Sequence, residues 1–292
     1  MSAFSGSNMV GRLRSVLVCT PKAAGWNSAA QANRWQELGF LHAPDFAKAA
    51  EQHTALCRQL QNASVEVDCL PASERLSLDA VYTHDASIVS DFGAIPFHSG
   101  KANRAGEREQ HRQFYQQIGI PVLGEVLPPG TAEAGDMIWL DAKTLVVGRG
   151  YRTNAAGIEQ IRNLLRPHSV DVIAAPLPHG AGPGTCLHLM SLISLLDEKT
   201  ALVDLAWLAV ETVELLSARG YKLIEIDSGE RDTLGCNVLS LGERKLLAIA
   251  ENVRTNEKLR AAGFDVRTFP GSEISVNGGG GPTCLTRPLF RD

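Results

Sequence analysis

The sequence predicts an α/β fold in which one domain, residues 1–292, is built from repeated ββαβ-like units. Short apolar, β-branched runs alternate along the chain with longer stretches in which apolar residues recur at helical spacing. Turn signals rich in Gly and Pro separate these runs, as at residues 128–130, 180–184 and 278–281. No long linker and no low-complexity segment divides the chain, so we expect a single domain.

The expected strands are short, and β-branched or other apolar residues dominate each of them. The repeating pattern is a hairpin of two such runs, then a helix, then one further run. In chain order, the runs that predict strands are residues 15–19, 65–69, 88–89, 137–140, 144–148, 170–174, 201–205, 222–226, 237–241, 246–250 and 266–269.

The expected helices lie between these strands. Residues 44–61 place Phe46, Leu56 and Leu60 among polar side chains, which is the pattern of a helix with one buried face. Asn154 is a residue type that commonly caps the start of a helix. The segments that predict helices are 44–61, 104–117, 154–165, 206–218 and 252–262.

Charge and composition are ordinary for a globular enzyme. The 28 basic and 32 acidic side chains give a net charge of −4 without any basic tract, so we expect neither nucleic acid nor a membrane as a partner. No apolar run approaches the roughly 20 residues that span a bilayer, and the first residues lack the pattern of a secretory signal. The six cysteines are scattered without a Cys-x-x-Cys pair, which favours reduced thiols in the cytoplasm.

The most informative segment lies near the C-terminus and reads Asn277-Gly-Gly-Gly-Gly-Pro-Thr-Cys284. Glycines let the backbone take positive φ and approach a ligand closely. A cysteine that leaves such a turn can be accessible, and neighbouring amides or cations would lower its pKa and favour the thiolate. The alternative is a glycine-rich surface turn beside a buried cysteine, and this segment alone does not decide between them.

Three other segments carry candidate side chains. His188 opens an apolar run after a Gly/Pro loop, where an imidazole can face a cleft as an acid or base, although a structural histidine is commoner. Glu133 and Asp136 flank small residues just before a strand, so paired carboxylates could bind a planar cation there. A simple acidic turn is the alternative. Asp85 stands directly before another strand-like run and indicates little by itself.

Taken together, these segments resemble the guanidine-modifying, or pentein, superfamily. The shared pattern is an Asp, then Glu-x-Gly-Asp, then His-Leu, then Gly-Gly-x-x-Cys. In this chain the Asp is Asp85, the second motif begins at Glu133, the third begins at His188 and the last ends at Cys284. Arg152-Thr-Asn matches another segment of the superfamily, and residues 103–107 are similar to its Arg-x-Gly-Glu loop. The matches extend over nearly the whole chain.

The resemblance implies a five-bladed α/β propeller of ββαβ units with the site in its central channel. It implies that Cys284 attacks the guanidinium carbon and that His188 protonates the leaving amine and then activates water. It also implies that Glu133 and Asp85 hold the guanidinium.

Further roles follow from the same resemblance. Asp136 is a second carboxylate for substrate binding, and Arg152 and Arg104 are candidates for a substrate carboxylate, which suits the fork of a guanidinium group. We expect no metal and no organic cofactor. The expected partner is a small guanidino substrate.

One departure from the superfamily bears on the substrate. Deiminases and amidinotransferases generally carry His-x-Asp, whereas Met190 stands two residues after His188. An apolar side chain in place of a charge favours a substituted guanidine if Met190 faces the substrate. The closest resemblance is therefore to the dimethylarginine dimethylaminohydrolases, with mono- or dimethylarginine hydrolysed to citrulline and a methylamine. Ala134 also replaces the usual Gly of that motif.

Two alternatives stay open. The protein could be a deiminase or hydrolase of arginine or another guanidino or ureido compound, or a binder of guanidino compounds without catalysis. The complete set of Cys284, His188 and Glu133 favours an enzyme, because a binder has no need of a nucleophile. Residues 25–44, with apolar side chains in an irregular setting, are expected to form a lid. A homodimer is also left open.

Overall fold

Five small β-sheets form the frame of the computed structural model, which describes residues 4–292. In the unit that begins at residue 137, β5 (Met137–Asp141) pairs antiparallel with β6 (Thr144–Arg149). Helix α5 (Ala155–Leu165) follows, and β7 (Asp171–Pro176) returns parallel to β6. This pairing confirms the ββαβ unit that the alternation of runs predicts.

Two further units repeat this order of hairpin, helix and parallel strand. Their elements are β8 (Ile193–Asp197), β9 (Thr200–Val203), α6 (Val210–Ala218) and β10 (Lys222–Glu225), then β11 (Leu239–Gly242), β12 (Lys245–Ile249), α7 (Val253–Ala261) and β13 (Asp265–Phe269).

The other two units depart from the pattern in ways that matter for the shape. After β3 (Ser87–Ser90), β4 (Gly93–Pro96) and α4 (Glu107–Gln117), the third strand is reduced to one bridge between Ala94 and Val122. The last unit is formed from both ends of the chain. Its elements are β14 (Arg287–Arg291), β1 (Leu13–Val18), α3 (Phe46–Asn62) and β2 (Glu66–Cys69).

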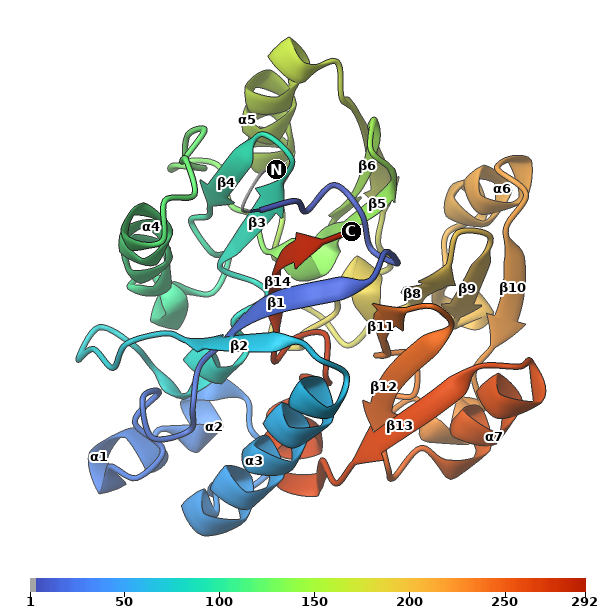
Figure 1. Ribbon diagram of the computed structural model, residues 1–292. Coiled ribbons are helices and arrows are strands. Elements are labelled where there is room, and N and C mark those ends of the chain that lie inside the picture. Colours follow the sequence, from blue (N-terminus) through green and yellow to red (C-terminus); the bar gives the residue numbers. More distant parts are fainter. Residues whose placement is uncertain (1–3) are drawn as a thin grey trace.

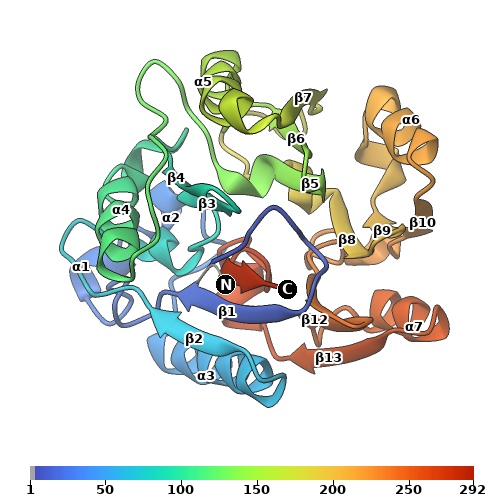
Figure 2. The same ribbon diagram turned by 45° about the horizontal axis from the view of Figure 1, so that its top comes forward.

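The five sheets surround a common centre, and helices α3 to α7 lie outside them (Figure 1). The tilted view shows the two ends of the chain near that centre, where β14 pairs with β1 (Figure 2). This arrangement agrees with the five-bladed α/β propeller that the resemblance implies. The ring is closed by the sheet that the N- and C-terminal segments share.

The apolar face of α3 shows how a helix fixes the centre. Leu56 and Leu60 are fully buried and belong to one apolar cluster with Leu17 of β1 and Leu289 of β14. Burying one leucine side chain contributes about 1.5–3 kcal/mol. Cys284 packs against the same cluster, so the segment that carries it rests on a well-packed floor.

Some boundaries differ from the expected ones. Strands β4, β8 and β14 were not predicted. Each is short, and its apolar run is interrupted by a polar residue, a proline or a glycine. Helices α4 and α6 begin three to four residues later than expected, because 3₁₀ turns at Ala102–Arg104 and Leu205–Trp207 precede them. The capping role of Asn154 is confirmed, since its side chain accepts a hydrogen bond from Gly157 N–H.

Residues 25–44 are more regular than expected. They contain two short helices, α1 (Ala29–Ala32) and α2 (Trp35–Leu38). Trp26 and Phe40 are buried and meet edge to face, and Leu41 N–H donates to the carbonyl of Asn277 at 2.9 Å. The segment therefore packs on the glycine loop. Within residues 4–292, no helix is long and apolar enough to cross a membrane.

Candidate active site

One pocket brings together five of the residues that the sequence indicates, although they are far apart in the chain. They are Asp85, Arg104, Arg152, His188 and Cys284. The rest of the wall comes from the glycine loop at 278–280 and from Leu38 and Gly39 of the segment 25–44. It also includes residues that the sequence did not indicate: Asp79, Tyr82, Lys101, Gly184 and Cys186.

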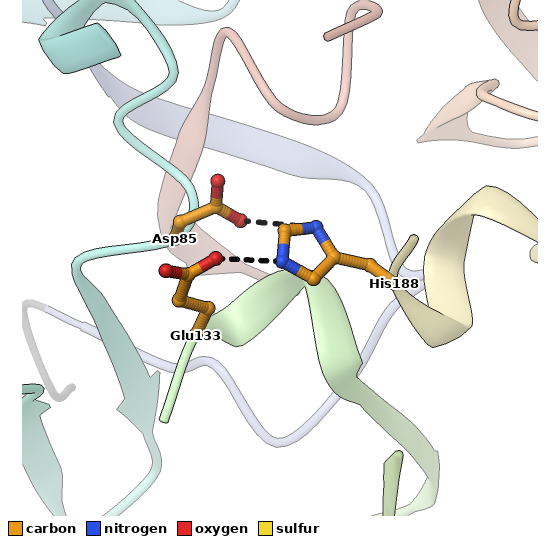
Figure 3. A group of neighbouring side chains, drawn as sticks. All are labelled: Asp85, Glu133 and His188. Carbon is orange, nitrogen blue, oxygen red and sulfur yellow. Dashed lines mark hydrogen bonds and ion pairs between the residues drawn. The ribbon is translucent and has the colours of Figure 1, made fainter. Parts of the chain in front are cut away.

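The ring of His188 faces two carboxylates, which lie on the same side of it (Figure 3). Its Nε2 is 2.7 Å from Oε2 of Glu133, and its Nδ1 is 3.8 Å from Oδ1 of Asp85. The backbone N–H of His188 donates to the hydroxyl of Ser191 at 3.2 Å, which fixes the start of the turn that follows. The imidazole is thus held by both its ring and its backbone.

The charges around His188 favour its protonated form. Burial alone would lower the pKa of this imidazole, but the sulfur of Cys186 and then the carboxylates of Asp85 and Asp136 raise it well above its usual value. Nδ1 is 3.6 Å from the Cys186 sulfur. A protonated imidazole next to a nucleophile can donate a proton to a leaving group.

Glu133 is fully buried, and its carboxylate is saturated with donors. Nη1 of Arg152 donates to Oε1 at 3.0 Å and to Oε2 at 3.2 Å, and the hydroxyl of Ser99 donates to Oε1 as well. Burial would raise the pKa of Glu133, but the hydrogen bond with His188 and the charge of Arg152 hold it well below its usual range. Glu133 therefore stays ionised and orients the imidazole.

Arg104 does not have the position that the sequence predicts for a group that binds the substrate carboxylate. Its Nη1 donates to Oδ2 of Asp85 at 2.5 Å, and its Nε and Nη2 form a bidentate pair with Glu107 at 2.9 and 2.7 Å. Nη2 also donates to the carbonyl of Tyr82 at 2.8 Å. The side chain is buried and lines the pocket, but its guanidinium is committed to the protein and positions Asp85.

Asp136 also differs from its expected role, because it lies outside the pocket. It is fully buried; Oδ2 accepts the hydroxyl of Thr153 at 2.6 Å and Oδ1 accepts the N–H of Leu189 at 3.0 Å. Burial raises the pKa of Asp136 to about 6. The carboxylate ties the turn after His188 to the start of β5 and supports the site without touching a substrate.

The expectation that Met190 faces the substrate is wrong. Its side chain is buried in an apolar cluster and lines a different cavity from the one that contains Cys284. Residues Leu189–Ser191 form a 3₁₀ turn, in which residues two apart point in different directions. A charge at Met190 would therefore disturb packing, and the specificity argument from this residue fails.

Close contacts and backbone conformation require glycine at several positions of the loop before Cys284. Gly279 has a φ of +81°, which side chains rarely adopt. A Cβ at Gly280 would lie 2.4 Å from the ring of Tyr82, and a Cβ at Gly281 would lie 2.6 Å from the side-chain amide of Asn237. The loop thus brings the backbone against two side chains of the pocket region.

The thiol of Cys284 is more enclosed than the sequence predicts. Burial and then the charge of Asp85 raise its pKa to about 12, and the charge of His188 offsets this only in part. Nδ2 of Asn237 donates to the sulfur at 3.1 Å, while its Oδ1 accepts the N–H of Thr283 at 3.0 Å. In the protein without substrate the thiol pKa is therefore raised rather than lowered, because burial and Asp85 together outweigh the opposing charge of His188.

Known proteins resemble this chain over most of its length. The family model for eukaryotic N,N dimethylarginine dimethylhydrolase matches residues 20–291. The chain belongs to this family. It is a hydrolase of the dimethylarginine dimethylaminohydrolase type, within the superfamily that the four segments indicate.

Relatives of two kinds occur. The dimethylarginine dimethylaminohydrolase of Pseudomonas aeruginosa is 30% identical over 246 residues, which cover 84% of this chain and 90% of that protein. An arginine deiminase of Staphylococcus haemolyticus is 27% identical over 217 residues, which cover 61% of this chain and 52% of that enzyme.

Solved structures show the same fold. A dimethylarginine dimethylaminohydrolase adduct with 4-chloro-2-hydroxymethylpyridine is 27% identical, with a TM-score of 0.74 over 95% of this chain and 100% of that chain. A Cys-to-Ser mutant of the Pseudomonas aeruginosa enzyme in complex with citrulline is 26% identical, with a TM-score of 0.77 over the same shares. The N-terminal domain of a cyanobacterial arginine dihydrolase, 22% identical with a TM-score of 0.78 over 95% of this chain and 98% of that one, shares the fold.

Several pocket residues of this hydrolase escaped the sequence analysis. Lys101 pairs with Asp79 at 2.5 Å and donates to the carbonyl of Leu38, also at 2.5 Å, so it joins the segment 25–44 to the pocket wall. Asn237 contacts the sulfur of Cys284 from the start of another unit. Nothing in their local sequence marks these residues, because only the closure of the ring brings them to the site.

Three side-chain atoms of the kinds that bind metal ions also lie close together in this site. One atom each from Asp85, Glu133 and His188 lie within 4.8 Å of one another. Metal binding requires a neutral imidazole, whereas the surroundings of His188 favour its protonated form. Both carboxylates are also paired with arginines. The expectation of a mechanism without a metal stays a prediction.

Proposed function

We propose that Cys284 is the nucleophile with which this hydrolase converts N-methylated arginines to citrulline and a methylamine. The observation that carries the proposal is the position of His188, beside Glu133 and Asp85 in the pocket of Cys284. Family membership supplies the reaction, and the pocket supplies a nucleophile, an acid and carboxylates for a guanidinium cation.

The reaction then proceeds in two steps. The sulfur of Cys284 bonds to the guanidinium carbon, and the C–N bond to the methylated nitrogen breaks as His188 gives that nitrogen a proton. The products of this step are a free methylamine and an S-alkylthiouronium on the enzyme. His188 next takes a proton from water, the resulting hydroxide attacks the same carbon, and the C–S bond breaks to release citrulline and the thiol.

The substrate itself helps to form the thiolate. Without substrate, burial and Asp85 keep the pKa of Cys284 at about 12, so the thiol is protonated at neutral pH. A guanidinium cation that binds Asp85 brings a positive charge next to the sulfur and offsets that carboxylate. The nucleophile is thus activated only when a cation is bound, which protects the thiol from unrelated reagents.

Substitution of Asp85 should separate these effects. Asp85→Asn should make the thiol react roughly tenfold faster with neutral iodoacetamide at pH 7.5, since the pKa of Cys284 falls when the carboxylate charge is removed. The same variant should react more slowly with cationic chloroacetamidine, because the carboxylate that attracts it is gone. Rates are measured by mass spectrometry and normalised to those of a free thiol.

Asp79→Asn is the matched control, because Asp79 lies in the same pocket but does not influence the pKa of Cys284. It should leave the iodoacetamide rate close to that of the wild type. If both reagents respond to Asp85→Asn in the same direction, Asp85 does not set the charge balance at the sulfur.

The rest of the substrate would be bound nearer the pocket mouth. Nη1 of Arg152 binds Glu133, and its Nε and Nη2 form no hydrogen bond within residues 4–292, so this side is suited to a substrate carboxylate. Lys101 is 20% exposed and could bind the same carboxylate. Asp79 is suited to the α-ammonium group. Arg104 acts by holding Asp85 in place.

A substrate panel tests the function. We expect the release of dimethylamine from asymmetric dimethylarginine to exceed the release of ammonia from arginine, with citrulline as the common product. Ammonia release from arginine at an equal or higher kcat/KM would make the protein a deiminase. Tight binding of both compounds without turnover would make it a binder.

For the substrate class, domain organisation and localisation, we keep the expectations from the sequence. The substrate class is a small guanidino compound, and residues 1–292 would act as one catalytic domain. We place the protein in the cytoplasm, on the basis of its six cysteines without a predicted disulfide framework. Gel filtration with light scattering would decide between a monomer and a homodimer.

A further inference from the structure

A second cavity of about 30 Å³ lies at the centre of the ring, apart from the pocket of Cys284. Each of the five sheets contributes to its wall. The contributing strand residues include Val89 of β3, Trp139 of β5, Leu195 of β8, Ser240 of β11, and Arg287 and Arg291 of β14. A single water needs about 10–15 Å³, so the cavity has room for a species of one or two heavy atoms.

Two arginines of β14 point into this cavity. Arg287 and Arg291 are four residues apart on one strand and therefore share a face, and they are only 4% and 2% exposed. Arg291 donates from Nη1 to the carbonyl of Gly11 at 2.7 Å and from Nη2 to the carbonyl of Ser240 at 2.8 Å. The Nε atoms of both arginines are buried without a hydrogen-bond partner among the described residues.

Among the described residues, Arg287 has one side-chain hydrogen-bond partner, His84, which is neutral. Its Nη2 contacts both ring nitrogens of His84, Nδ1 and, at 2.7 Å, Nε2, and Nδ1 is also 3.0 Å from the carbonyl of Thr286. Burial and the charge of Arg287 hold the pKa of His84 well below its usual value, so the ring is neutral. His84 thus brings no negative charge to the cavity.

Neither guanidinium is balanced by a carboxylate. Within residues 4–292, neither arginine forms an ion pair; Asp85, the one carboxylate that influences Arg287, is bonded to Arg104. Burial lowers the pKa of Arg287 to about 10 and that of Arg291 to about 9, so both groups remain cations at neutral pH. Two buried cations without a counter-charge are costly, and proteins normally pair such charges.

We propose that this central cavity binds a small inorganic anion of the halide type between Arg287 and Arg291. The two Nε–H groups offer donors, and a halide needs donors only, since it has no proton of its own to place. The mainly apolar wall suits a weakly hydrated anion, and the small volume of the cavity favours a monatomic one. This site is independent of the hydrolysis. The bound anion would balance the charge of the two arginines and so stabilise the centre at which the five sheets meet.

Bromide provides a direct test because its position can be seen by anomalous scattering. Crystals of the wild-type protein in sodium bromide should show an anomalous peak beside the guanidinium groups of Arg287 and Arg291. A water at that position, or no peak while bromide occupies other sites in the same crystal, would overturn the proposal. A peak without any effect of halide in solution would mean an adventitious ion only.

Thermal unfolding provides the solution test. At constant ionic strength, replacing gluconate with chloride should raise the Tm along a saturating curve, by about 2–4 °C at a tenfold excess over Kd. Arg287→Met should abolish the saturating rise, and without halide its Tm should equal or exceed that of the wild type. Arg254→Met removes an arginine that is 74% exposed and should keep the rise. A variant that is less stable in all salts but still responds to chloride would refute the site.

Discussion

Replacing Cys284 with serine should reduce the hydrolysis of dimethylarginine on the order of 10⁴-fold or more while the protein stays folded. The pocket already raises the pKa of the thiol to about 12, through burial and the charge of Asp85. A hydroxyl is far less acidic than a thiol, so the same surroundings leave almost no alkoxide even with a bound guanidinium. Citrulline formation measures the loss, and calorimetry with the substrate should show that binding persists.

The matched control is Cys69→Ser, which changes an exposed thiol outside the pocket and should keep full activity. The result would be contradicted if Cys284→Ser retained more than a few per cent of the wild-type rate. Cys186 would then be the next candidate, because its sulfur lines the same pocket and lies 3.6 Å from His188.

The residues of the site were predictable because the order of motifs along the chain carries their identity. The four segments contain the proposed nucleophile, the histidine and two carboxylates, and the structure brings all of them together at one place. The ββαβ repeat was equally predictable, since the period of apolar residues changes between strands and helices. The family match then decides what the alternation leaves open, namely which α/β fold is formed.

The direction of individual side chains could not be predicted. The specificity argument required Met190 to face the substrate, as His188 does. His188 instead precedes the 3₁₀ turn Leu189–Ser191, in which the side chain of Met190 points in another direction. The pairing of Arg104 could have been predicted from the sequence. Arg104 and Glu107 are three residues apart, a spacing at which side chains meet in a helical turn. Their bidentate pair commits the guanidinium to the protein.

Properties that depend on burial from distant segments were beyond the sequence. The raised pKa of Cys284 results from burial of the thiol and from the charge of Asp85, which lies about 200 residues earlier in the chain. The five residues of β14 carry two arginines, a composition typical of the surface, yet the ring closes over them. Only the pairing of β14 with β1 reveals that these charges are at the centre.

His188→Asn should slow hydrolysis by about 10²–10⁴-fold, the usual contribution of general acid–base catalysis. The surroundings raise the pKa of His188, so its acidic form persists above pH 6.5 and is lost only as the pH rises through the higher value. In the wild type, kcat/KM should therefore fall on the alkaline side of the profile, and the asparagine variant should lose that limb. Its thiouronium adduct should also accumulate, visible by mass spectrometry, because water activation is lost too.

The pH dependence of the free energy of unfolding provides an independent check that His188 is protonated in the folded protein. Because the folded state raises the pKa of His188, the imidazole stabilises the fold fully below about pH 6.5, and this contribution disappears as the pH rises through the folded-state value. His188→Asn should remove that pH dependence. His168→Asn is the control, since His168 stacks on Phe92 and does not line the pocket. An unchanged alkaline limb in His188→Asn would mean that another group transfers the proton, and Cys186 and Asp85 would be tested next.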